Sequence, residues 1–172
     1  MSITTTTTIT TITTTATTTP ATTATTTPAV KSRMLKSLDS VIIGYKHDLV
    51  NWKHGYTLKH RSLEMITNEF KILCSIKAKL IAGKDFDQQK FDDNFAIQNF
   101  MTTMQPKKIN AKTQAIREEG MLSELSTLIK DFHKLSLKLN DETITADYKN
   151  LQAVKLMFIY GVKYNADKHK TA

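Results

Sequence analysis

The sequence predicts an all-α fold, an elongated helical bundle or coiled coil with a long first helix and three shorter helices. Apolar residues recur at heptad spacing over much of the chain, as they do in packed helices. Only five glycines and three prolines occur, which is too few for the frequent turns of a β-sandwich or barrel. The 172 residues allow one compact domain, and the single cysteine excludes an internal disulfide framework.

Residues 1–33 are expected to form a disordered, low-complexity leader that is rich in threonine. The first thirty residues include eighteen threonines and no charged side chain. Threonine is a poor helix former, and the leader has too little apolar area to offset the entropy of ordering it. Its acid-free composition leaves mitochondrial import open as an alternative, and Met34 is a second candidate start. A single α-helical bundle domain is therefore expected at residues 34–172.

A heptad seam predicts that the first helix is long and continuous. Of the thirteen a and d positions between Leu38 and Leu80, eleven are apolar or aromatic. One helix from Ser37 to Ala82 would have about 46 residues and a length of about 69 Å. Gly55 is the position where a break is most plausible, but the seam stays in phase across it, which favours continuity.

The other predicted helices are too short to cover a first helix of that length. The uncovered part of the seam is therefore expected either to end at a kink or to meet another protein or a second copy of the chain. The residues expected to form this partner seam are Leu49, Trp52, Tyr56, Leu63, Ile66, Phe70 and Leu73.

Three shorter helices are expected after Gly83. The first lies within residues 85–106, an acidic segment with four phenylalanines that ends at Pro106. The second runs from an N-cap at Asn110 to about Leu139, and Asn140 can close it in the left-handed conformation.

The last predicted helix begins with a cap at either Asp141 or Thr143 and extends beyond Val162 to Tyr164. Its apolar residues lie on almost every side. Such a helix is buried, either at the centre of a bundle or against another chain.

The net charge of +8 is concentrated in one part of the sequence. Residues 31–84 carry eleven basic and four acidic side chains, whereas residues 85–106 carry four acidic and one basic. One flank of the predicted first helix is basic, and its residues are Lys46, His47, Lys53, His54, His60 and Arg61. This basic flank suits anionic lipid or an acidic partner, although a solvated face or pairing with the acidic segment would also account for it.

The sequence gives no indication of catalysis. No phosphate-binding glycine loop, no His-Glu-x-x-His pattern and no Cys/His cluster occurs, so no catalytic residue, metal ligand or cofactor site is predicted. Cys74 lies beside the seam and is expected to act as a small buried apolar residue. The basic flank lacks interleaved aromatic residues, which argues against binding of single-stranded nucleic acid.

The function expected from these observations is that of a non-enzymatic helical adaptor or subunit of a protein complex. It would associate through the heptad seam and the apolar last helix, without a small-molecule substrate. The alternative is a peripheral membrane module that uses the basic flank on anionic lipid. The expected compartment is the cytoplasm, because no apolar run approaches the ~20 residues of a membrane span and no secretory signal pattern occurs.

Overall fold

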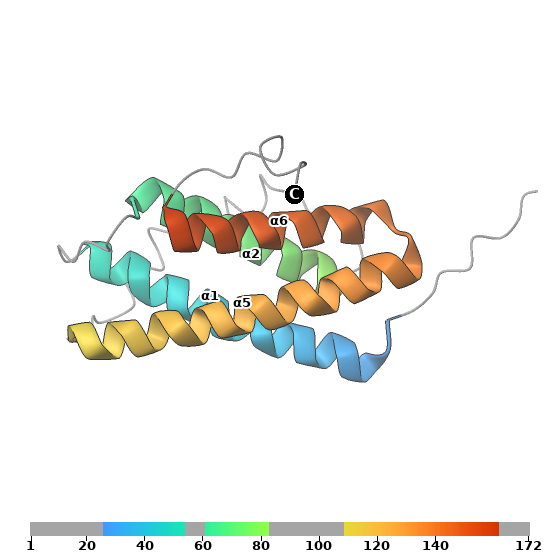
Figure 1. Ribbon diagram of the computed structural model, residues 1–172, viewed down its shortest axis with the longest axis horizontal. Helices are drawn as coiled ribbons and strands as arrows, with labels where there is room; N and C mark the ends of the chain where they lie inside the picture. The colour runs from blue at the N-terminus through green and yellow to red at the C-terminus, as the bar shows by residue number, and fades with distance from the viewer. Residues whose placement is uncertain (1–25, 54–60, 83–108, 162–172) are drawn as a thin grey trace, which may run out of the picture.

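The computed structural model describes residues 26–53, 61–82 and 109–161, which form an α-helical bundle (Figure 1). Helices α1 (Pro28–Lys53) and α2 (Leu63–Ala82) come from the part of the sequence that carries the seam. Helices α5 (Ala111–Leu139) and α6 (Glu142–Tyr160) complete the bundle. The predicted all-α class is confirmed for the described residues.

Helix α1 begins at Pro28, earlier than the predicted start at Ser37. Proline suits the first position of a helix because its fixed φ angle is helical and its missing N–H would have no intrahelical partner there. The carbonyl of Thr27 accepts the N–H of Lys31 at 3.0 Å, which is the first bond of the helical ladder. Residues 28–33, which were expected to belong to the disordered leader, are therefore part of the first helix.

The prediction of one continuous first helix is wrong. Helix α1 ends at Lys53, and Ser62 starts α2 by accepting the N–H of Met65 with its hydroxyl at 3.2 Å. The two helices are antiparallel neighbours, because Lys31 Nζ donates to the carbonyl of Ile81 at 3.3 Å. In a straight helix these residues would lie about 75 Å apart. The chain reverses between α1 and α2, and residues 54–60, including Gly55, lie outside the described residues.

The boundaries of α5 agree with the sequence prediction because its caps are local. Asn110 Oδ1 accepts the N–H of Thr113 at 2.8 Å and caps the start of the helix. At the other end Asn140 adopts the left-handed conformation, with φ 48°, and its N–H bonds to the carbonyl of Ser136.

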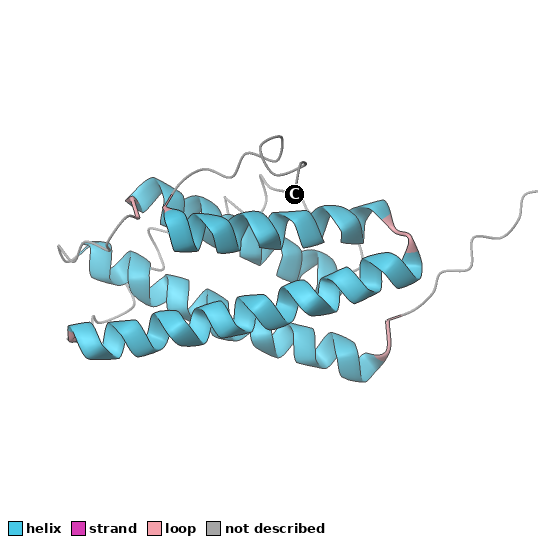
Figure 2. Ribbon diagram, in the orientation of Figure 1, coloured by secondary structure: helices cyan, strands magenta, loops and turns pink. Residues whose placement is uncertain are grey.

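Helix α6 starts directly after this turn, as Figure 2 shows by the short loop between the two helices. Of the two predicted caps, Asp141 is the one used, since its carboxylate accepts the N–H groups of Thr143 at 2.7 Å and Ile144 at 3.2 Å. The helix ends at Tyr160, before the predicted end, because Gly161 adopts the left-handed conformation with φ 63°.

The described helices form a ring in which every pair of neighbours is antiparallel. Helix α1 lies between α2 and α5, and α6 closes the ring by packing on α5 and α2 (Figure 1). Ion pairs establish the directions, since Arg33 near the start of α1 meets Asp131 in the last third of α5. Lys79 near the end of α2 meets Asp147 near the start of α6. Helices α2 and α5 therefore run in the same direction. The helix predicted within 85–106 lies outside the described residues.

The seam residues that were expected to meet a partner instead form the core of the bundle. Leu49, Ile66, Phe70 and Leu73 are buried among helices of the same chain, and Trp52 is half-buried. Leu63 is 43% exposed, and Tyr56 lies outside the described residues. The seam is largely an internal surface because the hairpin folds its two halves onto each other, a possibility that heptad spacing does not distinguish from a long rod.

The apolar residues of α6 are divided between the core and the surface. Leu151, Val154, Met157 and Phe158 are buried, which agrees with the expectation that this helix packs inside the bundle. Ile159 and Tyr160, the last two residues of the helix, are exposed.

Gly44 allows α1 and α5 to approach each other closely. A Cβ atom at this position would lie 2.9 Å from Met121 Cγ and closer still to its sulfur. The interior of a helix otherwise disfavours glycine by about 1 kcal/mol relative to alanine. Close packing against Met121 therefore accounts for a residue that costs helix stability.

Gly44→Ala is expected to lower the free energy of unfolding by about 1 kcal/mol, because overpacking outweighs the gain in helix propensity. The control is Gly120→Ala on α5, where a Cβ would meet no atom within 4 Å and the same propensity gain should stabilise the protein. Urea unfolding followed by circular dichroism measures both. Equal stabilisation by the two substitutions would contradict the close approach.

Candidate functional site

Four charged side chains form a buried cluster at one end of the bundle, called here the buried charge cluster and consisting of Asp48, Arg61, Glu69 and Arg117. Arg61 Nη1 lies 3.5 Å from Asp48 Oδ2, and Arg61 Nη2 is hydrogen-bonded to Glu69 Oε2. Arg117 from α5 pairs with the other oxygen of Asp48. The side chains of Asp48 and Glu69 are 0% exposed. Two cations and two anions leave the cluster with no net formal charge.

Aromatic rings hold the Arg61 guanidinium from other sides. Its central carbon lies 4.9 Å from the ring centroid of Tyr45 and 4.4 Å from that of Phe158. The two rings contact each other edge to face, with centroids 6.2 Å apart. Arginine suits this position better than lysine because its flat guanidinium stacks on rings while its N–H groups pair with carboxylates. The cluster thereby joins side chains of all the described helices.

Burial changes the proton affinity of these groups. Desolvation raises the pKa of Asp48 and of Glu69, while the neighbouring arginines act in the opposite direction. The pKa of Tyr45 is raised well above its usual 10.0 by burial and by the negative charge of Glu69. Covered carboxylates that are already paired with arginine are poorly placed to exchange protons with a substrate. The cluster instead stabilises the packing of the helices against one another.

The predicted basic flank is only partly a surface. Lys53 is exposed, Lys46 and His47 are half-buried, and His54 and His60 lie outside the described residues. Arg61 is buried, so its place on a solvated flank was wrong. The sequence signal for this burial is that Asp48 and Glu69 each precede an a position of the seam, Leu49 and Phe70, and so lie at the edge of the apolar stripe.

Two further expectations concern side chains that bind metals or react. Cys74 is 7% exposed, and burial raises the pKa of its thiol to about 11, which confirms its role as a small core residue. Among residues 26–53, 61–82 and 109–161, no group of three or more His, Cys, Asp or Glu side chains is arranged to hold a metal ion. In the same ranges, no helix is long and apolar enough to cross a membrane.

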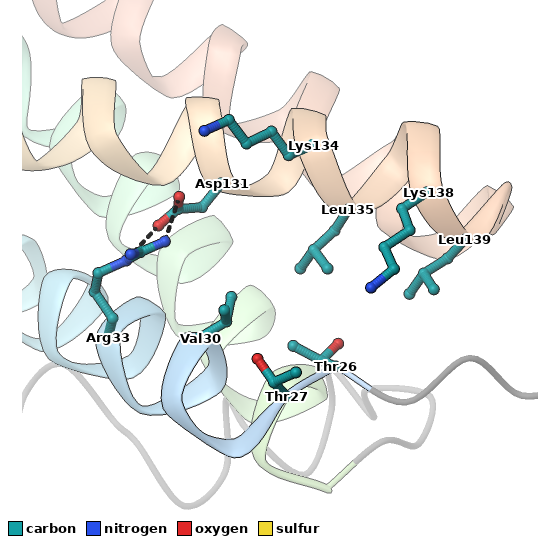
Figure 3. A pocket seen from close by; sticks show the side chains of 9 residues that line it. All are labelled: Thr26, Thr27, Val30, Arg33, Asp131, Lys134, Leu135, Lys138 and Leu139. Atoms are coloured by element: carbon teal, nitrogen blue, oxygen red, sulfur yellow. Dashed lines mark hydrogen bonds and ion pairs between the residues drawn. The ribbon is translucent and has the colours of Figure 1, made fainter.

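A small pocket opens at the opposite end of the bundle, between the start of α1 and the end of α5 (Figure 3). Its volume is about 160 Å³. Arg33 reaches across to Asp131 with two hydrogen bonds of 3.0 and 2.7 Å. Lys134 and Lys138 of α5 also line the pocket. We call this site the cationic pocket. Sequence analysis missed it because its two walls are about 100 residues apart in the chain.

Apolar side chains are exposed at the end of the bundle that carries the buried charge cluster. Leu63 is 43% exposed, Ile159 43% and Tyr160 63%, and these three residues are called the Tyr160 patch. Counted from the Lys79–Asp147 pair, Leu63 lies about 24 Å and Ile159 about 18 Å toward the same end of the bundle. Figure 1 shows the start of α2 and the end of α6 at that end.

Comparisons of this chain with protein-family models, curated proteins and solved structures find no match. The fold and the surfaces described above are therefore the basis on which a function is proposed.

Proposed function

We propose that this protein is a non-enzymatic, helical subunit of a protein assembly, and that it associates through the Tyr160 patch. The observation that carries the proposal is that Leu63 of α2 and Ile159 and Tyr160 of the neighbouring helix α6 are all exposed at the same end of the bundle. Ile116 on α5 is also exposed near that end. Scattered exposed apolar residues are common on protein surfaces, whereas grouped ones mark interaction sites. The cytoplasm is the compartment proposed for this assembly.

Contacts of neighbouring residues restrain the two segments that carry the Tyr160 patch. Arg61 stacks on Phe158, which directly precedes Ile159 and Tyr160, and Leu63 follows Arg61 by two residues. The buried charge cluster therefore fixes both of the segments that supply the patch. The backbone of these residues therefore has little conformational freedom to lose on binding, and tyrosine is enriched among residues that dominate interface energies.

The occupant proposed for the Tyr160 patch is a second copy of the chain. A twofold contact uses the same residues twice, so a small patch contributes double the apolar area, and twofold dimers are the commonest oligomers. A contact of this size gives weak association that depends on protein concentration.

Sedimentation velocity of the purified full chain over a wide concentration range tests this proposal. The wild type is expected to show a reversible increase in sedimentation coefficient, and Tyr160→Lys is expected to abolish it. Leu137→Lys is the matched control, since Leu137 on α5 is 72% exposed and lies outside the patch. A wild type that stays monomeric throughout, or an equal effect of both substitutions, would overturn the proposal.

A further inference from the structure

We propose that the cationic pocket binds a phosphate monoester or inorganic phosphate. The pocket lies at the end of the bundle away from the Tyr160 patch, so this inference is independent of the proposed function. It is lined by residues of α1 and α5 and of the segment just before α1, which are Thr26, Thr27, Val30, Arg33, Asp131, Lys134, Leu135, Lys138 and Leu139.

The charge of the lining is positive and is not balanced within the pocket. Arg33, Lys134 and Lys138 supply three cations, and Asp131 is the one carboxylate among the lining residues. Asp131 is almost fully buried, and each of its carboxylate oxygens accepts a hydrogen bond from Arg33. Two lysine charges therefore remain without an opposing charge in the lining.

Lys134 and Lys138 stand one helical turn apart on α5, where two like charges destabilise a helix by about 0.2–0.5 kcal/mol. Within the described residues, neither ammonium group has a hydrogen-bond or ion-pair partner, and both side chains are exposed. The negative end of the α5 dipole accounts for a lysine in its last turn, which is Lys138. It does not account for Lys134, which lies a turn earlier. Figure 3 shows the Lys138 side chain directed toward the threonine wall of the pocket and the Lys134 side chain directed away from Lys138, along α5 past Asp131. An anion in the pocket would therefore meet Lys138 directly and would attract Lys134 from the same helix.

The opposite wall adds groups that suit an anion. Thr26 and Thr27 supply hydroxyl groups, and Figure 3 shows Lys138 pointing toward them from α5. In the first turn of α1, the N–H groups of Ala29 and Val30 precede the first bond of the helical ladder, which Lys31 donates to Thr27. These groups add to the attraction that the lysines provide.

The size of the pocket and its apolar lining residues indicate which ligand it can hold. The pocket is small, with a volume of about 160 Å³, and it is partly open to solvent. This space fits one phosphate group with the first carbon atoms attached to it. Val30, Leu135 and Leu139 make part of the lining apolar, which suits the carbon side of an ester. Inorganic phosphate and the headgroup of a lipid such as phosphatidic acid share this chemistry.

Titration of the ¹⁵N-labelled full chain with inorganic phosphate at constant ionic strength tests the site by NMR. Saturable shifts of the Thr27, Val30 and Lys138 amides are expected in the wild type. Lys134→Gln with Lys138→Gln is expected to weaken binding by at least about tenfold, because charge-assisted hydrogen bonds are lost. Lys112→Gln with Lys130→Gln is the matched control, since both lysines are exposed on α5, neither lines the pocket, and the change in net charge is the same.

Cosedimentation with vesicles identifies the source of the phosphate group. Vesicles of phosphatidylcholine with phosphatidic acid are compared with vesicles carrying phosphatidylglycerol, a diester, at equal surface charge. Preference for phosphatidic acid that is lost in the pocket variant supports a lipid headgroup, and saturable phosphate binding without that preference supports free phosphate. The proposal is overturned if phosphate causes no saturable shift and vesicles show no preference, or if the pocket and control variants lose binding equally.

Discussion

Arg61→Met is expected to lower the free energy of unfolding by about 3–5 kcal/mol at neutral pH, because removing one member of a buried ion pair leaves its partner charged and unpaired. Glu69 loses its cation entirely, whereas Asp48 keeps Arg117. The guanidinium also leaves its position between the rings of Tyr45 and Phe158. Urea unfolding followed by circular dichroism measures the loss.

The deficit of this variant is expected to depend on pH in a defined direction. Burial already raises the pKa of Glu69 above its usual 4.5, and loss of Arg61 raises it further. An acid whose folded-state pKa is raised stabilises the fold below the unfolded-state pKa, and this stability is lost as the pH rises through the folded-state value. The deficit should therefore be smallest below about pH 4.5 and grow toward neutral pH.

Two further variants distinguish the effect of the buried ion pair from that of an exposed ion pair. Lys77→Met removes an ion pair with Asp39 that also joins α1 to α2 but has side chains 32% and 48% exposed. Its cost is expected to be about 1 kcal/mol or less. Adding Glu69→Gln to Arg61→Met should restore part of the lost stability, since no unpaired carboxylate remains. An Arg61→Met variant no less stable than Lys77→Met would show that the cluster does not hold the helices together.

Phe70→Ala is expected to destabilise the folded chain by about 3–5 kcal/mol, because truncation of a large buried side chain loses transfer energy and leaves a cavity. Phe70 is 1% exposed and lies in the core of the bundle. A seam that met another protein would behave differently. In that case the substitution would weaken association and leave the stability of the monomer nearly unchanged.

Leu63→Ala is the control for Phe70→Ala, because Leu63 occupies the same seam but is 43% exposed. Its effect on the free energy of unfolding is expected to stay within about 1 kcal/mol. Chemical denaturation at a protein concentration low enough to make self-association negligible gives the free energy of unfolding of both variants. Similar small effects of the two substitutions would contradict the internal position of the seam.

Local signals in the sequence were sufficient where a helix end depends on its own neighbours. Asn110 and Asn140 act within three or four residues of their own position, and the structure uses both as predicted. Asp141 is one of the two caps that the sequence left open for α6. Local signals were also sufficient for Cys74, whose burial follows from its place beside apolar seam residues. Capping and amphipathic patterning are short-range effects that the sequence carries. Two local signals were nevertheless missed, since Pro28 starts α1 earlier and Gly161 ends α6 earlier than predicted.

The largest error has a long-range cause. Heptad spacing identified the residues that avoid water, and Leu49, Ile66, Phe70 and Leu73 are indeed buried. It did not identify what covers them, since a rod meeting a partner and a hairpin folded on itself bury the same residues. The in-phase seam across residues 54–60 made the two possibilities indistinguishable.

The sequence alone thus determined the all-α class, the course of α5 and most of the apolar residues that form the core. Only the tertiary structure decided that α1 and α2 are separate antiparallel helices and that Arg61 pairs with Asp48 and Glu69 inside the bundle. It also brought together Arg33 and Asp131 at the cationic pocket. The physical reason is the range of the forces involved, because caps and periodicity act over a few residues whereas ion pairs and packing join residues far apart in the chain.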